Sequence, residues 1–82
     1  MTLNDAVNLI YTDGNGLTVY VFDDEEYRDL FRESGSDEGL LFTIRSQFKF
    51  DNILKEKYAH AHVTAIFLVD GNTVDVIINP EE

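Results

Sequence analysis

Carboxylates are the reactive side chains that this sequence gathers most densely, and they concentrate between Phe22 and Glu38. Eight acidic residues stand there against two arginines, so the stretch carries a formal charge of −6 out of −10 for the whole chain. Carboxylates can exchange protons, bind hard cations or attract a basic surface. Only the last role needs no particular spacing, so we expect this stretch to bind a basic partner.

The candidate partner-binding residues are the acids that a helix and the loop after it would expose: Asp23, Glu25, Glu26, Asp29, Glu33, Asp37 and Glu38. At helical spacing, Arg28 can pair with Asp24 or Glu25. Arg32 can pair with Asp29, and each such pair contributes only about a few tenths of a kcal/mol. These pairs leave Glu26, Glu33, Asp37 and Glu38 without partners. The alternative interpretation is a solvated helix whose charge only keeps a small protein soluble.

Metal and catalytic sites receive little support from the remaining residues. His60 and His62 are spaced as half of a metal site on one strand face, but no third ligand stands near them, so pH sensitivity is the more modest role for them. Adjacent acids such as Asp23 and Asp24 point to different sides of a helix start, and no serine has the context of a nucleophile. We therefore expect no enzyme, no cofactor and no bound metal.

Length and charge narrow the class of protein further. The chain has 82 residues, enough for one domain and one core, with 16 acidic residues against six basic ones and no cysteine. The acidic balance disfavours nucleic acid and anionic membranes as direct ligands. The lack of cysteine excludes disulfides and suits a cytoplasmic protein, and no signal peptide is visible. A halophilic origin is an alternative explanation of the acidity.

The N-terminal residues 2–11 fit two patterns. Leu3, Ala6 and Val7 follow helical spacing, and Thr2 can cap such a helix. A strand is the other interpretation, because strong turn chemistry follows at residues 13–16 and a β-favouring run begins at Leu17. We expect a hairpin that pairs Asn8–Thr12 with Leu17–Asp23.

The rest of the chain reads as alternating helices and strands. A helix is expected from Asp23 or Asp24 to Gly35, with Tyr27, Leu30 and Phe31 as its core-facing stripe. The other expected elements are a strand over Leu40–Phe50, a short helix after Asp51 that includes Leu54, Tyr58 and Ala61, a central strand over Val63–Val69, and a last strand over Val74–Asn79. This order, β-β-α-β-α-β-β, predicts a single α+β domain with about five mainly antiparallel strands and the helices on one face.

Two functions remain open on this basis. The favoured one is a small binding protein that blocks the basic surface of a nucleic-acid-handling enzyme or of a toxin, because carboxylates can occupy the place of phosphates. Phage or mobile-element inhibitors and antidotes have this general size and charge. The alternative is an assembly module, such as a homodimer, that self-associates through sheet edges while its acidity only provides solubility.

Overall fold

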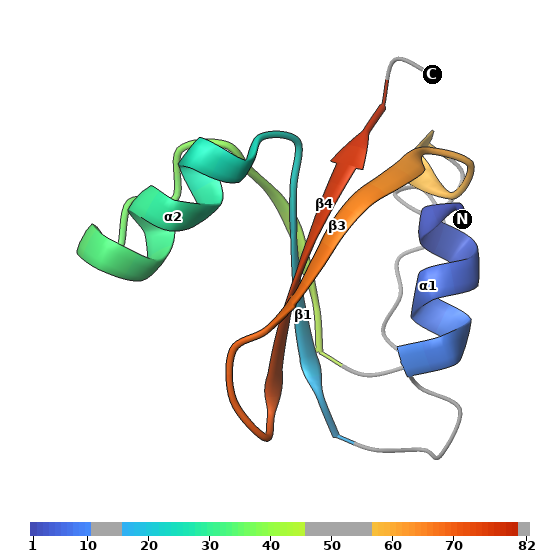
Figure 1. The fold of residues 1–82 in the computed structure, drawn as a ribbon, viewed down its shortest axis with the longest axis horizontal. Coiled ribbons are helices and arrows are strands. Elements are labelled where there is room, and N and C mark those ends of the chain that lie inside the picture. The colour runs from blue at the N-terminus through green and yellow to red at the C-terminus, as the bar shows by residue number, and fades with distance from the viewer. Residues whose placement is uncertain (11–15, 46–56, 81–82) are drawn as a thin grey trace.

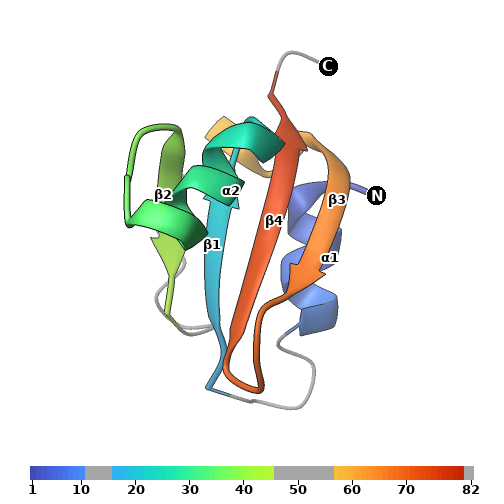
Figure 2. The ribbon, with the colours of Figure 1, turned by 60° about the vertical axis from the view of Figure 1, so that its left-hand side comes forward.

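A mixed four-stranded sheet with one helix on each face makes up the described part of the chain (Figures 1 and 2). The computed structural model describes residues 1–10, 16–45 and 57–80. Its elements are α1 (Leu3–Ile10), β1 (Thr18–Phe22), α2 (Glu25–Ser34), β2 (Leu40–Ile44), β3 (His62–Leu68) and β4 (Thr73–Asn79). The strand order is β2-β1-β4-β3. The predicted α+β class is therefore confirmed.

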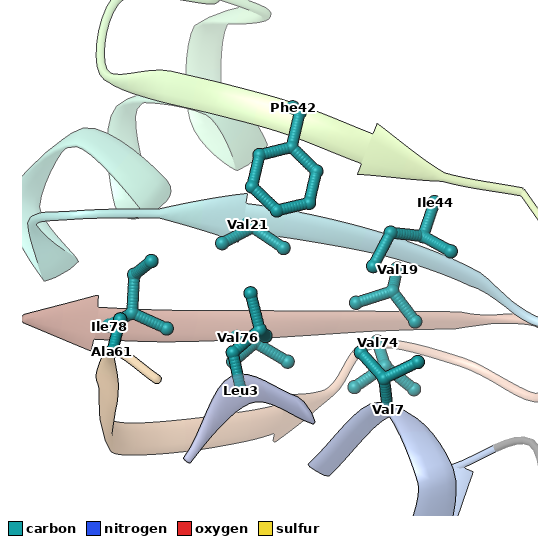
Figure 3. Close-up of a cluster of buried hydrophobic side chains, with 10 residues drawn as sticks. All are labelled: Leu3, Val7, Val19, Val21, Phe42, Ile44, Ala61, Val74, Val76 and Ile78. Carbon is teal, nitrogen blue, oxygen red and sulfur yellow. The ribbon is translucent and has the colours of Figure 1, made fainter. Parts of the chain in front are cut away.

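The two central strands, β1 and β4, run parallel to each other. Both are covered on two faces, and parallel strands buried in this way consist of nearly continuous apolar residues. One face of this pair holds the core cluster that Figure 3 shows, where side chains from α1, β1, β2 and β4 meet Ala61. The cluster is Leu3, Val7, Val19, Val21, Phe42, Ile44, Ala61, Val74, Val76 and Ile78.

The N-terminal segment is a helix, so the predicted first hairpin is wrong. Asn8 and the two residues after it belong to α1. A reciprocal capping box begins the helix: the Asp5 amide donates to Thr2 Oγ1 at 3.3 Å, and the Thr2 amide donates to Asp5 Oδ2 at 3.3 Å. Leu3 and Val7 then pack on the sheet. Burial of this apolar stripe outweighs the strand pattern.

The C-terminal hairpin is present as predicted, but its two strands have exchanged roles. β3 and β4 pair antiparallel across the turn at residues 70–72. β3 was expected to be central and is instead an edge strand, with alternate side chains exposed. β4 is central and is buried from Val74 to Ile78. β4 is central because it pairs with β3 on one side and with β1 on the other.

The middle of the chain agrees with the sequence where it is described. Phe42 and Ile44 of β2 are buried and Arg45 is exposed, as the alternation predicts. Tyr58 stacks on Phe42 with ring centroids 5.4 Å apart, and Ala61 is buried. Most of the predicted short helix, and the end of the predicted strand over Leu40–Phe50, lie outside the described residues.

The helices lie on opposite faces, which corrects the expectation that both cover one face (Figure 2). β1 explains this arrangement, because its side chains alternate between the faces. Val19 and Val21 point into the cluster with α1, whereas Tyr20 and Phe22 meet Phe31 of α2. The expected five-stranded antiparallel order is likewise wrong, since α1 replaces the first strand and β1 pairs parallel to β4.

Candidate functional site

Helix α2 carries four of the seven predicted partner-binding residues, and its limits follow from local chemistry. Asp24 is the N-cap: its Oδ1 accepts from the Glu26 amide at 2.8 Å. Glu25 and Glu26 fill the first turn, where negative charge complements the helix dipole. Gly35 ends the helix with φ 75°, and its amide donates to the Phe31 carbonyl at 3.0 Å. The predicted helix is confirmed.

The apolar stripe of α2 is only partly used for packing. The Phe31 ring lies 5.2 Å from that of Tyr20 and 5.5 Å from that of Phe22, between ring centroids. No residue of α2 is fully buried, however, and Leu30 is 44% exposed. The expectation that Leu30 belongs to the core is wrong, because the helix meets the sheet along a narrow line through Phe31.

A buried carboxylate supplies the rest of the attachment. Asp75, in the central strand β4, is fully buried and accepts hydrogen bonds from two arginines of α2. Arg28 Nε donates to Asp75 Oδ2 at 2.9 Å, and Arg32 Nε donates to the same oxygen at 2.7 Å. Arg32 Nη2 donates to Asp75 Oδ1. These bonds satisfy the carboxylate, which makes its burial tolerable.

Aromatic rings complete the surroundings of both guanidinium groups. The Arg28 guanidinium carbon lies 4.1 Å from the centre of the Phe67 ring of β3. The Arg32 guanidinium carbon lies 4.9 Å from the centres of both the Tyr20 and Phe31 rings. Cations over ring faces are attracted electrostatically. The arginines thereby connect α2 to three strands of the sheet.

These contacts replace the ion pairs expected within the helix. Arg28 pairs with Asp75 and, through Nη1 at 3.0 Å, with Asp29, rather than with Asp24 or Glu25. Arg32 pairs with Asp75 rather than with Asp29. The hydrogen bond to Asp75 is the main reason that the pKa of Arg32 is raised above its ordinary value. The arginines pair with Asp75 rather than with acids of the helix because Asp75 is buried, and a desolvated carboxylate attracts a cation more strongly than an exposed one.

With both arginines on the sheet side, the outward surface of α2 carries carboxylates. At 3.6 residues per turn, Glu25, Glu26, Asp29 and Glu33 fall within an arc of about 100° on the side of the helix away from Phe31. All four are exposed, as are Asp23 before the helix and Asp37 and Glu38 after it. We call the seven predicted partner-binding residues the acidic face. Leu30 borders it, one turn after Glu26.

The loop between α2 and β2 holds the end of the acidic face close to the helix. Gly39 has φ 84°, and a Cβ built on it would lie 2.5 Å from Cβ of Tyr27. Only glycine allows this approach. The Leu40 amide donates to the Asp37 carbonyl at 3.1 Å, and the Glu38 amide donates to Ser36 Oγ at 3.4 Å. Asp37 and Glu38 therefore extend the charge of the helix.

Asp75 is the residue that the sequence interpretation missed. A signal was present, because it is a lone acid within the otherwise apolar run of β4. An acid at such a position needs a cation partner. The spacing of Arg28 and Arg32, one helical turn apart, offered two. What the sequence did not show is that β4 lies under α2.

The histidines and serines considered as metal or catalytic residues do not form a site with the acidic face in the part of the chain that the structure describes. His60 and His62 are both exposed, near the start of β3. Over residues 1–10, 16–45 and 57–80, no group of three or more His, Asp or Glu residues is placed to hold a metal ion. Ser34 Oγ donates to the Leu30 carbonyl at 2.9 Å, so this hydroxyl serves the helix backbone.

Comparison of the chain with known protein families, with curated proteins and with solved structures found no match in any of the three. Among the described helices, none has the length and apolar character needed to cross a bilayer. Function must therefore be inferred from the site itself.

Proposed function

We propose that this chain is a small non-enzymatic binding protein that uses its acidic face to cover a basic surface of a nucleic-acid-handling protein. The observation that carries the proposal is the orientation of Arg28 and Arg32. Both are turned to Asp75, and the one carboxylate of the acidic face that either of them pairs with is Asp29, which Arg28 contacts through Nη1. Within the described chain, the ion pairs of these two arginines therefore do not include Glu25, Glu26 or Glu33. Carboxylates this close together repel one another, and this repulsion opposes folding. We therefore infer that the concentrated charge serves binding rather than stability.

The chemistry of the acidic face suits a surface that otherwise binds phosphates. Lysine and arginine side chains of nucleic-acid-binding proteins recognise closely spaced negative charges. A helix that presents several carboxylates outward competes for those cations, and its charge accelerates association at low salt. Phage and mobile-element inhibitors act in this general manner. The proposal includes a cytoplasmic location, which the absence of cysteine favours.

Charge reversal tests this proposal. The variant Glu26→Lys/Glu33→Lys changes the middle of the acidic face, and Asp37→Lys/Glu38→Lys changes its end. The matched control is Glu81→Lys/Glu82→Lys, which alters the net charge by the same amount at the C-terminus. Each protein is used to capture its partner from a lysate of the native host, and binding of that partner is then titrated with and without competing duplex DNA or RNA.

We expect both acidic-face variants to lose binding and the C-terminal control to keep it. Wild-type binding should weaken with added salt, because salt screens the attraction between the acidic face and the cations of the partner. It should also weaken with competing nucleic acid, because phosphates bind the same cations. Equal binding by the acidic-face and control variants, or binding unaffected by salt and nucleic acid, would show that the proposal is wrong.

A further inference from the structure

Over residues 1–10, 16–45 and 57–80, most of the outer edge of β3 has no strand beside it. Its first residues are covered by the N-terminus: the Leu3 amide donates to the Ala61 carbonyl, and the Val63 amide donates to the Met1 carbonyl, both at 2.9 Å. From Thr64 to Leu68, no strand of the described chain lies beside this edge. Backbone amides and carbonyls along an open edge are a template for another strand.

This edge lacks the usual protection against pairing. From Val63 to Val69 the chain has no charged residue and no proline. The irregularity in the pairing of β3 falls between Val63 and Ala65, which leaves the following residues regular. Natural edges are generally shielded by charges, prolines or bulges. The chain has a net charge of −10, so this uncharged edge differs from the acidic character of the protein as a whole.

The edge also exposes apolar side chains on one face. Ile66 is 44% exposed and Leu68 is 81% exposed. They are opposite Val76 and Val74, so they lie on the α1 side of the sheet, away from α2. A strand that pairs with β3 must therefore be uncharged and apolar on this face. The chain itself offers such a strand, because β3 has this character.

We propose that a second copy of this chain occupies the edge, with the two β3 strands antiparallel about a twofold axis. The covered N-terminal part of β3 sets the register. Within the described chain, Thr64–Leu68 is the part of this edge with no strand beside it, and the symmetric alignment that uses all of it places Ile66 opposite Ile66 and Thr64 opposite Leu68. Two four-stranded sheets then become one continuous sheet, and Leu68 loses much of its exposure.

The charge distribution is compatible with this dimer. α2 packs over β1 and β4, so each acidic helix lies about two strand spacings from the seam, and the two helices are roughly 20 Å apart. That distance exceeds the Debye length of about 8 Å at physiological ionic strength. Repulsion between the copies should therefore be strong at low salt and largely screened at physiological salt. Salt should strengthen the dimer, whereas it should weaken docking to a basic partner.

A cysteine scan provides a direct test, because the wild-type chain has no cysteine. Ile66→Cys places two thiols opposite each other, with Cα atoms about 4.5–5.5 Å apart as in an antiparallel pair, which a disulfide can span. The matched control is Leu30→Cys, because Leu30 is also 44% exposed. We expect Ile66→Cys to form the disulfide-linked dimer at least about tenfold faster, since pairing raises the effective thiol concentration. Equal rates would overturn the proposal.

Light scattering on the wild-type chain, from micromolar to millimolar concentration, provides the second measurement. The paired edge is short and belongs to the weak, concentration-dependent class of interfaces. We expect a monomer–dimer transition that moves to lower concentration with salt, and its loss in Leu68→Lys with an unchanged Tm. Leu9→Lys, an exposed apolar position on α1, is the control. A wild-type monomer at millimolar concentration in high salt would overturn the proposal.

The dimer and the proposed partner binding can fail independently. Glu26→Lys/Glu33→Lys changes the acidic face and should leave the dimer intact or strengthen it. Leu68→Lys should leave capture of a basic partner intact. Loss of the dimer in the acidic-face variant, with the transition unchanged in Leu68→Lys, would place the interface on α2 and overturn the β3 assignment.

Discussion

Arg32 of α2 and Asp75 of β4 stand 43 residues apart in the chain, and Arg32 Nε donates to Asp75 Oδ2 at 2.7 Å in the folded protein. Arg28 donates to the same oxygen at 2.9 Å. Because no side chain of α2 is fully buried, this pairing holds the helix in place together with the contacts of Phe31. The same contacts direct positive charge inward and leave the acidic face outward.

Replacing Asp75 should strongly destabilise the fold. In Asp75→Asn, two partly buried guanidinium groups lose the carboxylate that neutralises them, and breaking a buried ion pair in this way costs about 3 kcal/mol or more. Urea unfolding of Asp75→Asn and of the wild type measures the difference. Glu33→Gln removes an exposed carboxylate and should change the unfolding free energy by less than about 0.5 kcal/mol. Equal effects of the two variants would contradict the assigned role of Asp75.

Replacing Arg28, Arg32 and Asp75 together should lower the free energy of unfolding less than replacing Asp75 alone. The triple variant Arg28→Met/Arg32→Met/Asp75→Leu exchanges buried charge for apolar packing, which is often neutral or stabilising. We expect it to regain at least about 2 kcal/mol of unfolding free energy relative to Asp75→Asn. Chemical denaturation compares the two. A triple variant as unstable as Asp75→Asn would mean that specific hydrogen bonds, rather than uncompensated charge, dominate.

The stabilisation that Arg32 provides should not change in moderately alkaline solution. Its pKa is raised above the ordinary value of an arginine, mainly by the hydrogen bond to Asp75. A base with a raised pKa stabilises the folded state fully below its unfolded pKa, and this stabilisation is lost only as the pH rises through the folded pKa. The difference in unfolding free energy between wild type and Arg32→Met should therefore be constant between about pH 7 and 10. Denaturant titrations across this range would contradict the assignment if the difference declined.

Two glycines with similar backbone angles should respond differently to alanine. Gly35 has φ 75° with open space around it, whereas Gly39 has φ 84° and an added Cβ there would stand 2.5 Å from side-chain atoms of Tyr27. Gly35→Ala should cost about 1 kcal/mol through backbone strain alone. Gly39→Ala adds a steric clash and should cost at least about 1 kcal/mol more. Thermal unfolding compares the pair, and equal losses would mean that the loop moves away from Tyr27 without penalty.

The candidate site was predictable in its exposed part and not in its buried part. Acids at the start of a helix and in a polar loop are exposed in almost any fold, so Glu26, Glu33 and Glu38 could be named from the sequence. The partners of Arg28 could not, because the nearest acids in the helix and the distant Asp75 were both available. Arg28 binds Asp75 because the attraction between a cation and a buried carboxylate is screened least by water.

The sequence by itself determined the elements whose signals are local. The capping residues Asp24 and Gly35 set the ends of α2, the alternation around Phe42 predicted β2, and the turn after Val69 joined β3 to β4. Only the tertiary structure decided that residues 3–10 are a helix, that β1 lies parallel to β4, and that α2 lies over Asp75. These outcomes depend on which surfaces meet, because burial and loss of water strengthen contacts that neighbouring residues in the chain leave undecided.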